Sequence, residues 1–233
     1  MKFMKPVSLY LSHGKLLYLA MASVLLINSC VLAPVNSHYE SASTIEKNHL
    51  EASANLERYD AVVNGDAEKS NYNFGAILGY GFGERFDIKA RYTFLNQFDD
   101  ETVDNFTPTR YNYFGLSPKY QIVDKILAVK IPVGLYLYLP SNGESEAVYT
   151  VSPAVIGTLP LNQQADITLI SQYQFSSEYS DFLGFSLGFG FSKDLSKWAV
   201  RPELGYQFET EDFDGSGFLN FGVGFVYSFN VNK

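Results

Sequence analysis

Apolar residues recur at every second position along most of this chain, in runs of about ten residues separated by turns. The stretch 86–94 reads FDIKARYTF, and the stretch 183–191 reads LGFSLGFGF. A period of two is that of a β-strand whose faces meet different surroundings, because successive side chains point to opposite sides. The sequence therefore predicts an all-β protein built from many amphipathic strands.

The runs divide into ten predicted strands. Eight or twelve strands are the alternatives, because the first run carries little apolar bulk and the stretch 97–109 can be read in more than one way. Pro132, Pro153 and Pro202 lie inside runs, where each removes a ladder donor, and we expect them to mark β-bulges. The expected strands are 48–60, 72–82, 85–96, 110–122, 126–139, 146–159, 164–176, 182–192, 197–209 and 217–230.

The connections between these strands alternate in length and charge. Those after the second, fourth, sixth and eighth strands are short turns. Those after odd-numbered strands are mostly longer, and the stretches 97–109 and 209–216 are strongly acidic. Short periplasmic turns and longer outer loops are typical of membrane barrels. An even number of strands then places both termini at the periplasmic end.

The polar face of the strands indicates which side of the sheet meets water. A soluble barrel of the lipocalin kind would alternate too, but its polar face would be dense in Lys, Glu and Asp. Here that face is mostly Gly, Ser, Thr and Gln, while 17 Tyr and 19 Phe make the apolar face too large for so small a core. We therefore predict a transmembrane, up-and-down antiparallel β-barrel whose polar face lines the lumen.

Eight charged residues fall on the predicted lumen face. A Lys or Arg facing lipid at mid-depth would cost about 2–4 kcal/mol, which favours the lumen. Five of the eight are basic and three acidic, so they form either an ion-pair network that plugs the barrel or a narrow, slightly cationic pathway. Ten strands enclose little open space, which favours the plug. The eight are Asp87, Lys89, Arg91, Lys119, Lys130, Asp166, Arg201 and Glu203.

The first residues have the pattern of a secretory signal. Basic residues precede the apolar run Leu16–Ile27, which is too short to span a bilayer as a helix. The run ends in INSC at 27–30, which resembles a bacterial lipobox and makes Cys30 the predicted lipidation site. Cys30 is the only cysteine, so no disulfide within the chain is expected; a cysteine without any such role is the alternative.

These features predict three segments: a lipoprotein signal peptide at 1–29, a periplasmic tether at 30–47 and the barrel at 48–233. In the sorting pattern that the lipobox resembles, an aspartate after the cysteine retains lipoproteins in the inner membrane. Val31 stands there instead, which implies the bacterial outer membrane. The lipid on Cys30 is then expected in the periplasmic leaflet, where two or more acyl chains give stable anchoring.

Several function classes are disfavoured by what the chain lacks. A net charge of −8 argues against nucleic acid as a partner, because phosphate binding needs a basic surface. The barrel enzymes known as omptins, phospholipase A and the lipid A modifying enzymes need a histidine, and there is none from 50 to 233. No Cys/His metal spacing occurs either. We therefore expect no enzyme activity, no metal and no cofactor.

Four short stretches carry a resemblance to a known class of protein. They are YESAST at 39–44, NFG at 73–75, LGYG at 78–81 and FDIKARY at 86–92. With the overall strand pattern, they are similar to small outer-membrane β-barrel lipoproteins of the Bacteroidota type. The resemblance implies a fold and a compartment but transfers no site residues. Expected partners are outer-membrane lipids, lipopolysaccharide, and the outer-membrane assembly and lipoprotein-sorting machinery.

Three functions fit these expectations. The first is a non-enzymatic barrel with a structural or surface role and a plugged or very narrow lumen. The second is a narrow channel or carrier for a small solute. The third is a surface adhesin or binding module that uses the acidic loops.

Overall fold

A computed structural model describes residues 35–63, 66–96, 110–138, 146–178, 180–210 and 217–231. The chain divides into two compact units, Met1–Leu32 and Ala33–Lys233, and every described residue belongs to the second. The predicted signal peptide at 1–29 and the predicted lipidation site at Cys30 therefore lie outside the described residues. Within the described part there is no helix of the length and apolarity needed to cross a membrane.

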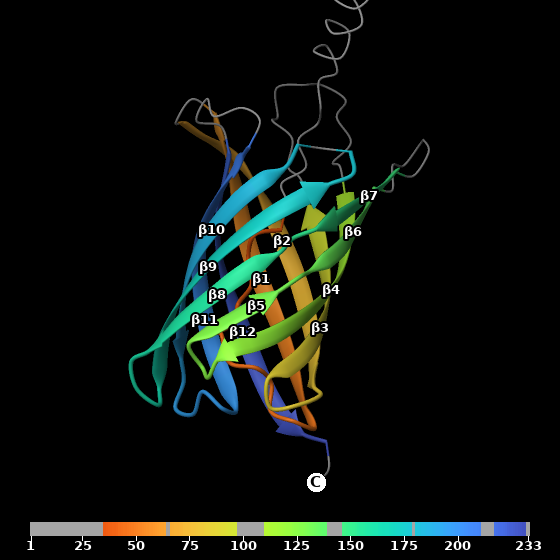
Figure 1. Ribbon diagram of the computed structural model, residues 1–233. Coiled ribbons are helices and arrows are strands. Elements are labelled where there is room, and N and C mark those ends of the chain that lie inside the picture. Colours follow the sequence, from red (N-terminus) through yellow and green to blue (C-terminus); the bar gives the residue numbers. More distant parts are fainter. Residues whose placement is uncertain are drawn as a thin grey trace, which may run out of the picture. The chain divides into compact units, whose positions relative to one another are not determined.

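Twelve strand segments form one antiparallel sheet, in which β1 pairs with both β2 and β12 and so closes the sheet into a barrel. Figure 1 shows the strands tilted around a common axis. The segments are β1 (His49–Val63), β2 (Asp66–Gly81), β3 (Phe86–Asn96), β4 (Arg110–Val123), β5 (Leu127–Lys130), β6 (Val133–Tyr138), β7 (Glu146–Val151), β8 (Ala154–Pro160), β9 (Ala165–Ser176), β10 (Phe182–Phe191), β11 (Trp198–Glu209) and β12 (Gly217–Asn230).

These segments make ten strands, because β5 and β6 continue one another, as do β7 and β8. Both β5 and β6 pair with β4, and both β7 and β8 pair with β9. Each strand lies beside its neighbours in sequence, which is the up-and-down arrangement. The predicted all-β, antiparallel, ten-stranded barrel is confirmed, including the weak first strand.

The prolines interrupt strands without shifting their register. Before and after Pro132, the pairs Lys119↔Lys130 and Leu116↔Val133 keep the same register. Pro153 separates β7 from β8 in the same way, and near Pro202 the β10–β11 ladder skips pairs without a shift. The expected bulges at these prolines are therefore wrong. A missing N–H removes hydrogen bonds from the ladder, but it does not require an extra residue.

The barrel is apolar outside and polar inside, the reverse of a soluble protein. Leu78, Tyr149 and Phe221 are 62%, 63% and 59% exposed, and large apolar side chains are exposed on every long strand. The buried set is instead rich in charged, amide and hydroxyl side chains. This inversion is expected of a barrel whose outer surface contacts lipid.

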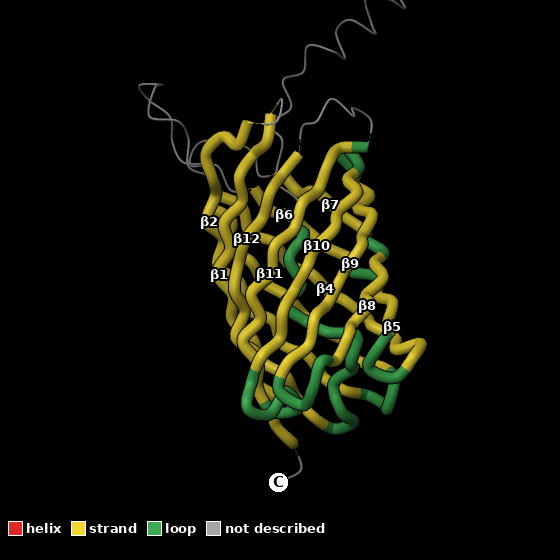
Figure 2. The backbone as a smooth tube through the Cα atoms, turned by 90° about the vertical axis from the view of Figure 1, so that its left-hand side faces the viewer, coloured by secondary structure: helices red, strands yellow, loops and turns green. Residues whose placement is uncertain are grey.

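The two ends of the barrel differ. The connections at 82–85, 124–126, 161–164 and 192–197 are short and gather at one end, with the last strand finishing beside them (Figure 2). We call this the turn end and the opposite one the loop end. The acidic stretches 97–109 and 211–216, on which the adhesin hypothesis rests, lie outside the described residues.

Candidate functional site in the barrel lumen

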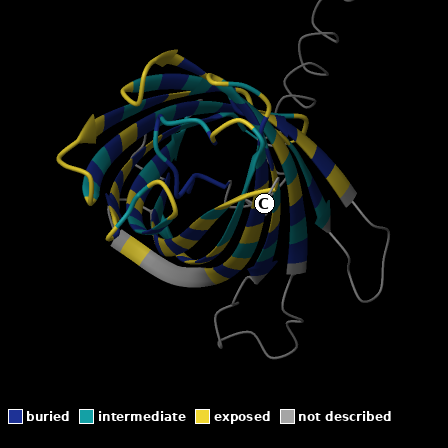
Figure 3. Cartoon of the chain, turned by 90° about the horizontal axis from the view of Figure 1, so that it is seen from below, coloured by how far each residue is buried: buried dark blue, intermediate teal, exposed yellow. Residues whose placement is uncertain are grey.

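Residues 35–47, which we call the plug, occupy the lumen of the barrel. Val35 to Glu40, Ala42 and Ile45 are each exposed by 7% or less. Viewed along the barrel, this buried stretch lies inside the ring of strands (Figure 3). The structure thus differs from the predicted periplasmic tether at 30–47, because 35–45 is enclosed by the strands. Glu46 and Lys47 are exposed at the turn end, and 30–34 lies outside the described residues.

Side chains of the lumen wall satisfy the backbone of the plug. An irregular backbone that is buried away from water needs a partner for each N–H and C=O. Tyr136 Oη accepts the N–H of Val35 at 2.8 Å, and Thr158 Oγ1 accepts the N–H of Ala42 at 2.8 Å. Four more such bonds join Asn36 N to Tyr59 Oη at 2.9 Å, Ile45 N to Asp87 Oδ2 at 2.8 Å, Gln172 Nε2 to Val35 O at 3.0 Å and Gln121 Nε2 to Ala42 O at 3.4 Å.

The plug bends at Tyr39, which has a φ of 53° in the left-handed region. Glu203 of β11 holds this bend, because its two carboxylate oxygens accept the N–H groups of His38 at 2.8 Å and of Tyr39 at 2.7 Å. A bulky residue keeps such a backbone conformation only where its surroundings fix it. Glu203 is therefore a plug-binding residue rather than part of a wall ion pair.

Glu40 is the charged centre of the plug. Its carboxylate lies 2.6 Å from Lys130 Nζ, 3.0 Å from Lys119 Nζ and 3.1 Å from Lys89 Nζ. All four side chains are nine-tenths buried or more. Lys130 Nζ also lies 2.6 Å from Nδ1 of His38. One plug carboxylate is thus shared by three wall ammonium groups.

Two further wall charges bind the plug. Asp87 accepts the Ile45 N–H and lies 3.5 Å from Lys119 Nζ. Arg91 donates to the backbone carbonyl of Ser37 and pairs with Glu57 Oε1 at 2.6 Å. Six of the eight predicted lumen charges therefore contact the plug.

The other two predicted lumen charges pair with each other. Arg201 of β11 donates to both carboxylate oxygens of Asp166 of β9, each at 2.9 Å. The two strands flank β10, whose Gly190 lies between the two side chains and leaves room for them. A bidentate pair of this kind ties the wall together without the plug.

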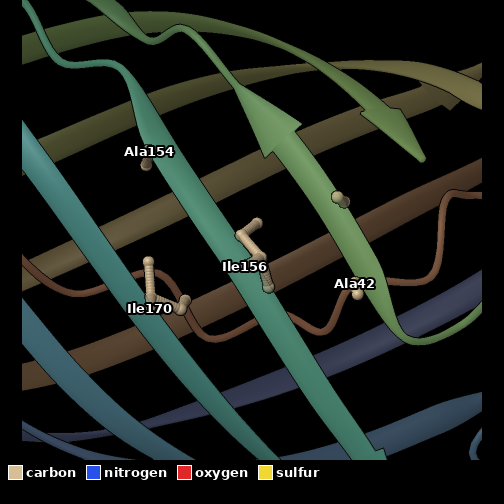
Figure 4. Close-up of a cluster of buried hydrophobic side chains, with 5 residues drawn as sticks. Ala42, Ala154, Ile156 and Ile170 are labelled. Carbon is tan, nitrogen blue, oxygen red and sulfur yellow. The ribbon is translucent and has the colours of Figure 1, made fainter. Parts of the chain in front are cut away.

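The plug also has an apolar contact with the wall. Ala42 packs in a buried cluster with Ala128, Ala154, Ile156 and Ile170. Figure 4 shows Ala42 on the plug beside the strands that carry Ile156 and Ile170. The plug is therefore held by hydrogen bonds, ion pairs and packing at once.

Two cavities border Glu40. One of about 40 Å³ lies between the plug and the wall, with His38, Arg91 and Lys130 in its lining, and has room for a few water molecules. The other, about 840 Å³, is lined by residues of the turns 161–164 and 192–197. We call this larger cavity, at the turn end, the vestibule. Glu40 and Lys89 are the residues common to both linings.

Strand glycines make room for the plug. A Cβ added to Gly222 would collide with the Tyr39 hydroxyl, and one added to Gly184 would collide with the Asn36 amide. A Cβ on Gly224 would lie 2.6 Å from the Cβ of Tyr39. Part of the glycine-rich polar face is thus explained by the chain that packs against it, and other glycines, such as Gly75 and Gly134, make room for wall side chains.

Replacing Gly224 by Ala is therefore expected to displace Tyr39 and to destabilise the folded barrel by about 1–3 kcal/mol, as overpacking does. The midpoint temperature of the folded-to-unfolded gel shift measures this. Gly157→Ala is the matched control, because the nearest atom to its new Cβ is Leu169 O at 3.9 Å. Equal stability of the two variants would contradict the position of Tyr39.

The sequence prediction missed the acidic partners Glu40, Glu51 and Glu57. Glu51 lies 2.6 Å from Lys89 Nζ, and Glu57 pairs with Arg91. A signal was present, because five predicted lumen cations faced only three predicted lumen anions. Buried cations need counter-charges. Here the weak first strand supplies Glu51 and Glu57, and the segment before it supplies Glu40.

Among the described residues, no group of three or more His, Cys, Asp or Glu side chains could hold a metal ion. Six of the eight predicted lumen charges thus converge on the plug, and the Arg201–Asp166 pair lines the vestibule beside them. The arrangement is suited to holding a polypeptide and an anionic group inside the barrel.

A scan of protein-family models and a search of curated proteins each found no match. Solved structures with a similar fold include an outer membrane channel from Pseudomonas putida F1, 12% identical, with a TM-score of 0.49 over 85% of this chain and 100% of that one. The translocator domain of the autotransporter NalP from Neisseria meningitidis is 10% identical, with a TM-score of 0.44 over 94% and 96% of the two chains. The outer membrane protease OmpT from Escherichia coli is 9% identical, with a TM-score of 0.42 over 81% and 100%. At this similarity we draw no functional conclusion from them.

Proposed function

We propose that this protein is a non-enzymatic outer-membrane β-barrel lipoprotein with a structural or surface role, whose lumen is closed by its own N-terminal segment. The burial of the plug carries this proposal. Its residues fill the space that a pore would need, and wall side chains bind its backbone as well as its charges. A lumen built in this way binds a polypeptide segment of the same protein and does not form a water-filled passage.

The membrane location is supported by the outer surface. Monomeric soluble proteins rarely expose large apolar patches, whereas here large apolar side chains are exposed on every long strand. A closed sheet has no free edge, so its backbone groups are paired between strands, as lipid requires. Short turns at one end and longer connections at the other fit insertion into the bacterial outer membrane.

The lipid anchor is a further part of the proposal and rests on the sequence. Cys30 follows a signal-like segment and precedes the plug by five residues. Cleavage of the Ser29–Cys30 peptide bond and acylation of Cys30 would make this residue the lipid-bearing mature N-terminus. The lipoprotein-sorting machinery of a bacterium of the Bacteroidota type would then deliver the protein to the outer membrane. The remaining expected partners are outer-membrane lipids, lipopolysaccharide and the barrel-assembly machinery.

The absence of enzyme activity is also proposed on chemical grounds. Two histidines are among the described residues. His38 is buried in the lumen, and its Nδ1 lies 2.6 Å from Lys130 Nζ, whereas His49 is at the turn-end start of β1, with its Nε2 3.7 Å from Glu46. A general base must reach the proton that it removes, and the His38 ring is enclosed by the plug and wall.

A second function, as a carrier for a small solute, is favoured by the vestibule. Its volume of about 840 Å³ lies within the range of small-molecule sites, and its lining includes the charged residues Glu51, Lys89 and Arg201. A carrier of this kind would bind solute at the turn end without a continuous open pore.

Electrical recording from the wild-type barrel in planar bilayers tests the plugged lumen. We expect no stable conductance steps, because the plug keeps its hydrogen bonds in the absence of a ligand. The gel shift between folded and boiled samples confirms that the inserted protein is a folded barrel. Steady, reproducible steps from wild-type protein would contradict the proposal.

A further inference from the structure

Two lysines of the lumen wall stand directly opposite one another. Lys119 of β4 and Lys130 of β5 are cross-strand partners in register, and both are buried. Lys89 of β3 brings a third ammonium group to the same place. Like charges placed directly opposite on neighbouring strands destabilise a sheet, so this arrangement requires an anion between them.

The anion present is Glu40, and it binds as a ligand would. Oε1 accepts from Lys130 Nζ at 2.6 Å, while Oε2 accepts from Lys119 Nζ at 3.0 Å and lies 3.1 Å from Lys89 Nζ. The carboxylate therefore bridges the two opposed lysines, one oxygen to each. It comes from the irregular plug, not from a strand of the wall.

The charge around the three lysines leaves a place for one negative charge. Asp87 lies 3.5 Å from Lys119, and Glu51 lies 2.6 Å from Lys89. These two wall carboxylates balance two of the three ammonium groups. The wall alone therefore holds a single uncompensated positive charge, which suits the carboxylate of a small solute or a singly charged phosphate.

The cluster can be approached from the turn end. Glu40 and Lys89 line the vestibule on one side and the small cavity on the other. The Glu40–Lys89 pair thus forms part of the partition between the two cavities. A solute that enters the vestibule meets this pair before any other part of the three-lysine cluster.

We infer that Lys89, Lys119 and Lys130 form a binding site for the anionic group of a small solute, and that Glu40 is its built-in occupant. An incoming carboxylate or phosphate would replace Glu40 between the lysines and free the plug from its contact with all three of them. This inference deepens the proposed function and rests on it, because the plug supplies Glu40.

Chemical rescue of a Glu40→Ala variant tests the site. The substitution removes the built-in carboxylate and leaves space for a free one. Folded barrel is heated in sodium chloride, sodium acetate or sodium phosphate at equal ionic strength and neutral pH, and the midpoint of the gel shift is recorded. We expect acetate to raise the midpoint with increasing concentration until it saturates, because a ligand that binds only the folded state stabilises it.

Two controls isolate the site. Wild-type protein should respond to acetate only at much higher concentrations than Glu40→Ala does, because free acetate must first displace Glu40 from the lysines. Glu46→Ala should not respond either, because Glu46 lies in the same segment with its side chain 71% exposed. A response to phosphate but not to acetate would support the site and assign it to phosphate, while equal behaviour in all three salts would overturn it.

The outcome stays informative when the variant is unstable. Should Glu40→Ala fail to fold in chloride, its folding yield in acetate or phosphate becomes the readout, and failure in all three would count against the site. This result is separate from the plugged lumen, which the wild-type conductance measures. A closed wild-type barrel with no rescue of Glu40→Ala would leave the plug in place and remove the anion site alone.

Discussion

Deleting residues 35–45 is expected to open the barrel, giving discrete conductance steps in planar bilayers where the full-length protein gives none. The plug supplies the chain that fills the lumen, and six wall charges bind it. Without it those charges would be solvated by water drawn into the lumen. The effect is the largest that we expect, because it converts a closed barrel into a pore.

The deletion variant needs a companion in which the plug stays but cannot move. Ala42 N donates to Thr158 Oγ1 at 2.8 Å, so a cysteine at each of the two positions places a pair of thiols at the plug–wall contact. With the disulfide formed, the double-cysteine variant should give no conductance steps in planar bilayers. A deletion variant that migrates as a folded barrel yet shows no steps would mean that the wall closes the lumen without the plug.

Replacing Glu40 by Gln is expected to destabilise the folded barrel by about 3–5 kcal/mol, the cost of removing one partner from a buried ion pair. The amide keeps the size of the side chain but removes its charge. Lys119 and Lys130 then face each other across the strands without an anion between them. The midpoint temperature of the gel shift should fall accordingly.

Glu46→Gln is the matched control for this measurement. It makes the same chemical change in the same segment, but the Glu46 side chain is 71% exposed and contacts only His49 among the described ion pairs, at 3.7 Å. Exposed pairs of this kind contribute about 0–1 kcal/mol. Equal stability of the two variants would show that the lysines do not depend on Glu40.

The strand pattern was readable from the sequence because a membrane barrel imposes one simple condition on each strand. Because the barrel meets lipid outside and a polar lumen inside, apolar and polar side chains must alternate along each strand. Phe86 and Asp87 therefore lie on opposite faces of the sheet. Turn residues then mark the ends. Even β1, with little apolar bulk, follows from the need for an even number of strands in a closed up-and-down barrel.

The plug was not readable in the same way. Residues 35–47 show no hydrophobic periodicity, because an irregular segment contacts the wall through backbone atoms at some positions and through side chains at others. Val35 is bound through its backbone, whereas Glu40 is bound through its side chain. Polar residues such as Ser37 and Ser41 look solvent-exposed in sequence, yet a polar lumen buries them or partly buries them. Hydrophobicity therefore gives no sign of enclosure when the interior is itself polar.

The seam between β1 and β12 joins the first strand of the barrel to the last, and the plug immediately precedes β1. If the ring closes last at this seam, a plug that is already in place can meet its wall partners as the strands assemble, whereas a plug that entered later would have to pass along the barrel axis with its charged side chains. Pairing partners as distant as His49 and Asn230 form slowly, because loop closure is costly over long separations. The internal segment can serve during that interval as a scaffold on which the lumen side chains assemble, so that the order of the sequence also sets the order of construction.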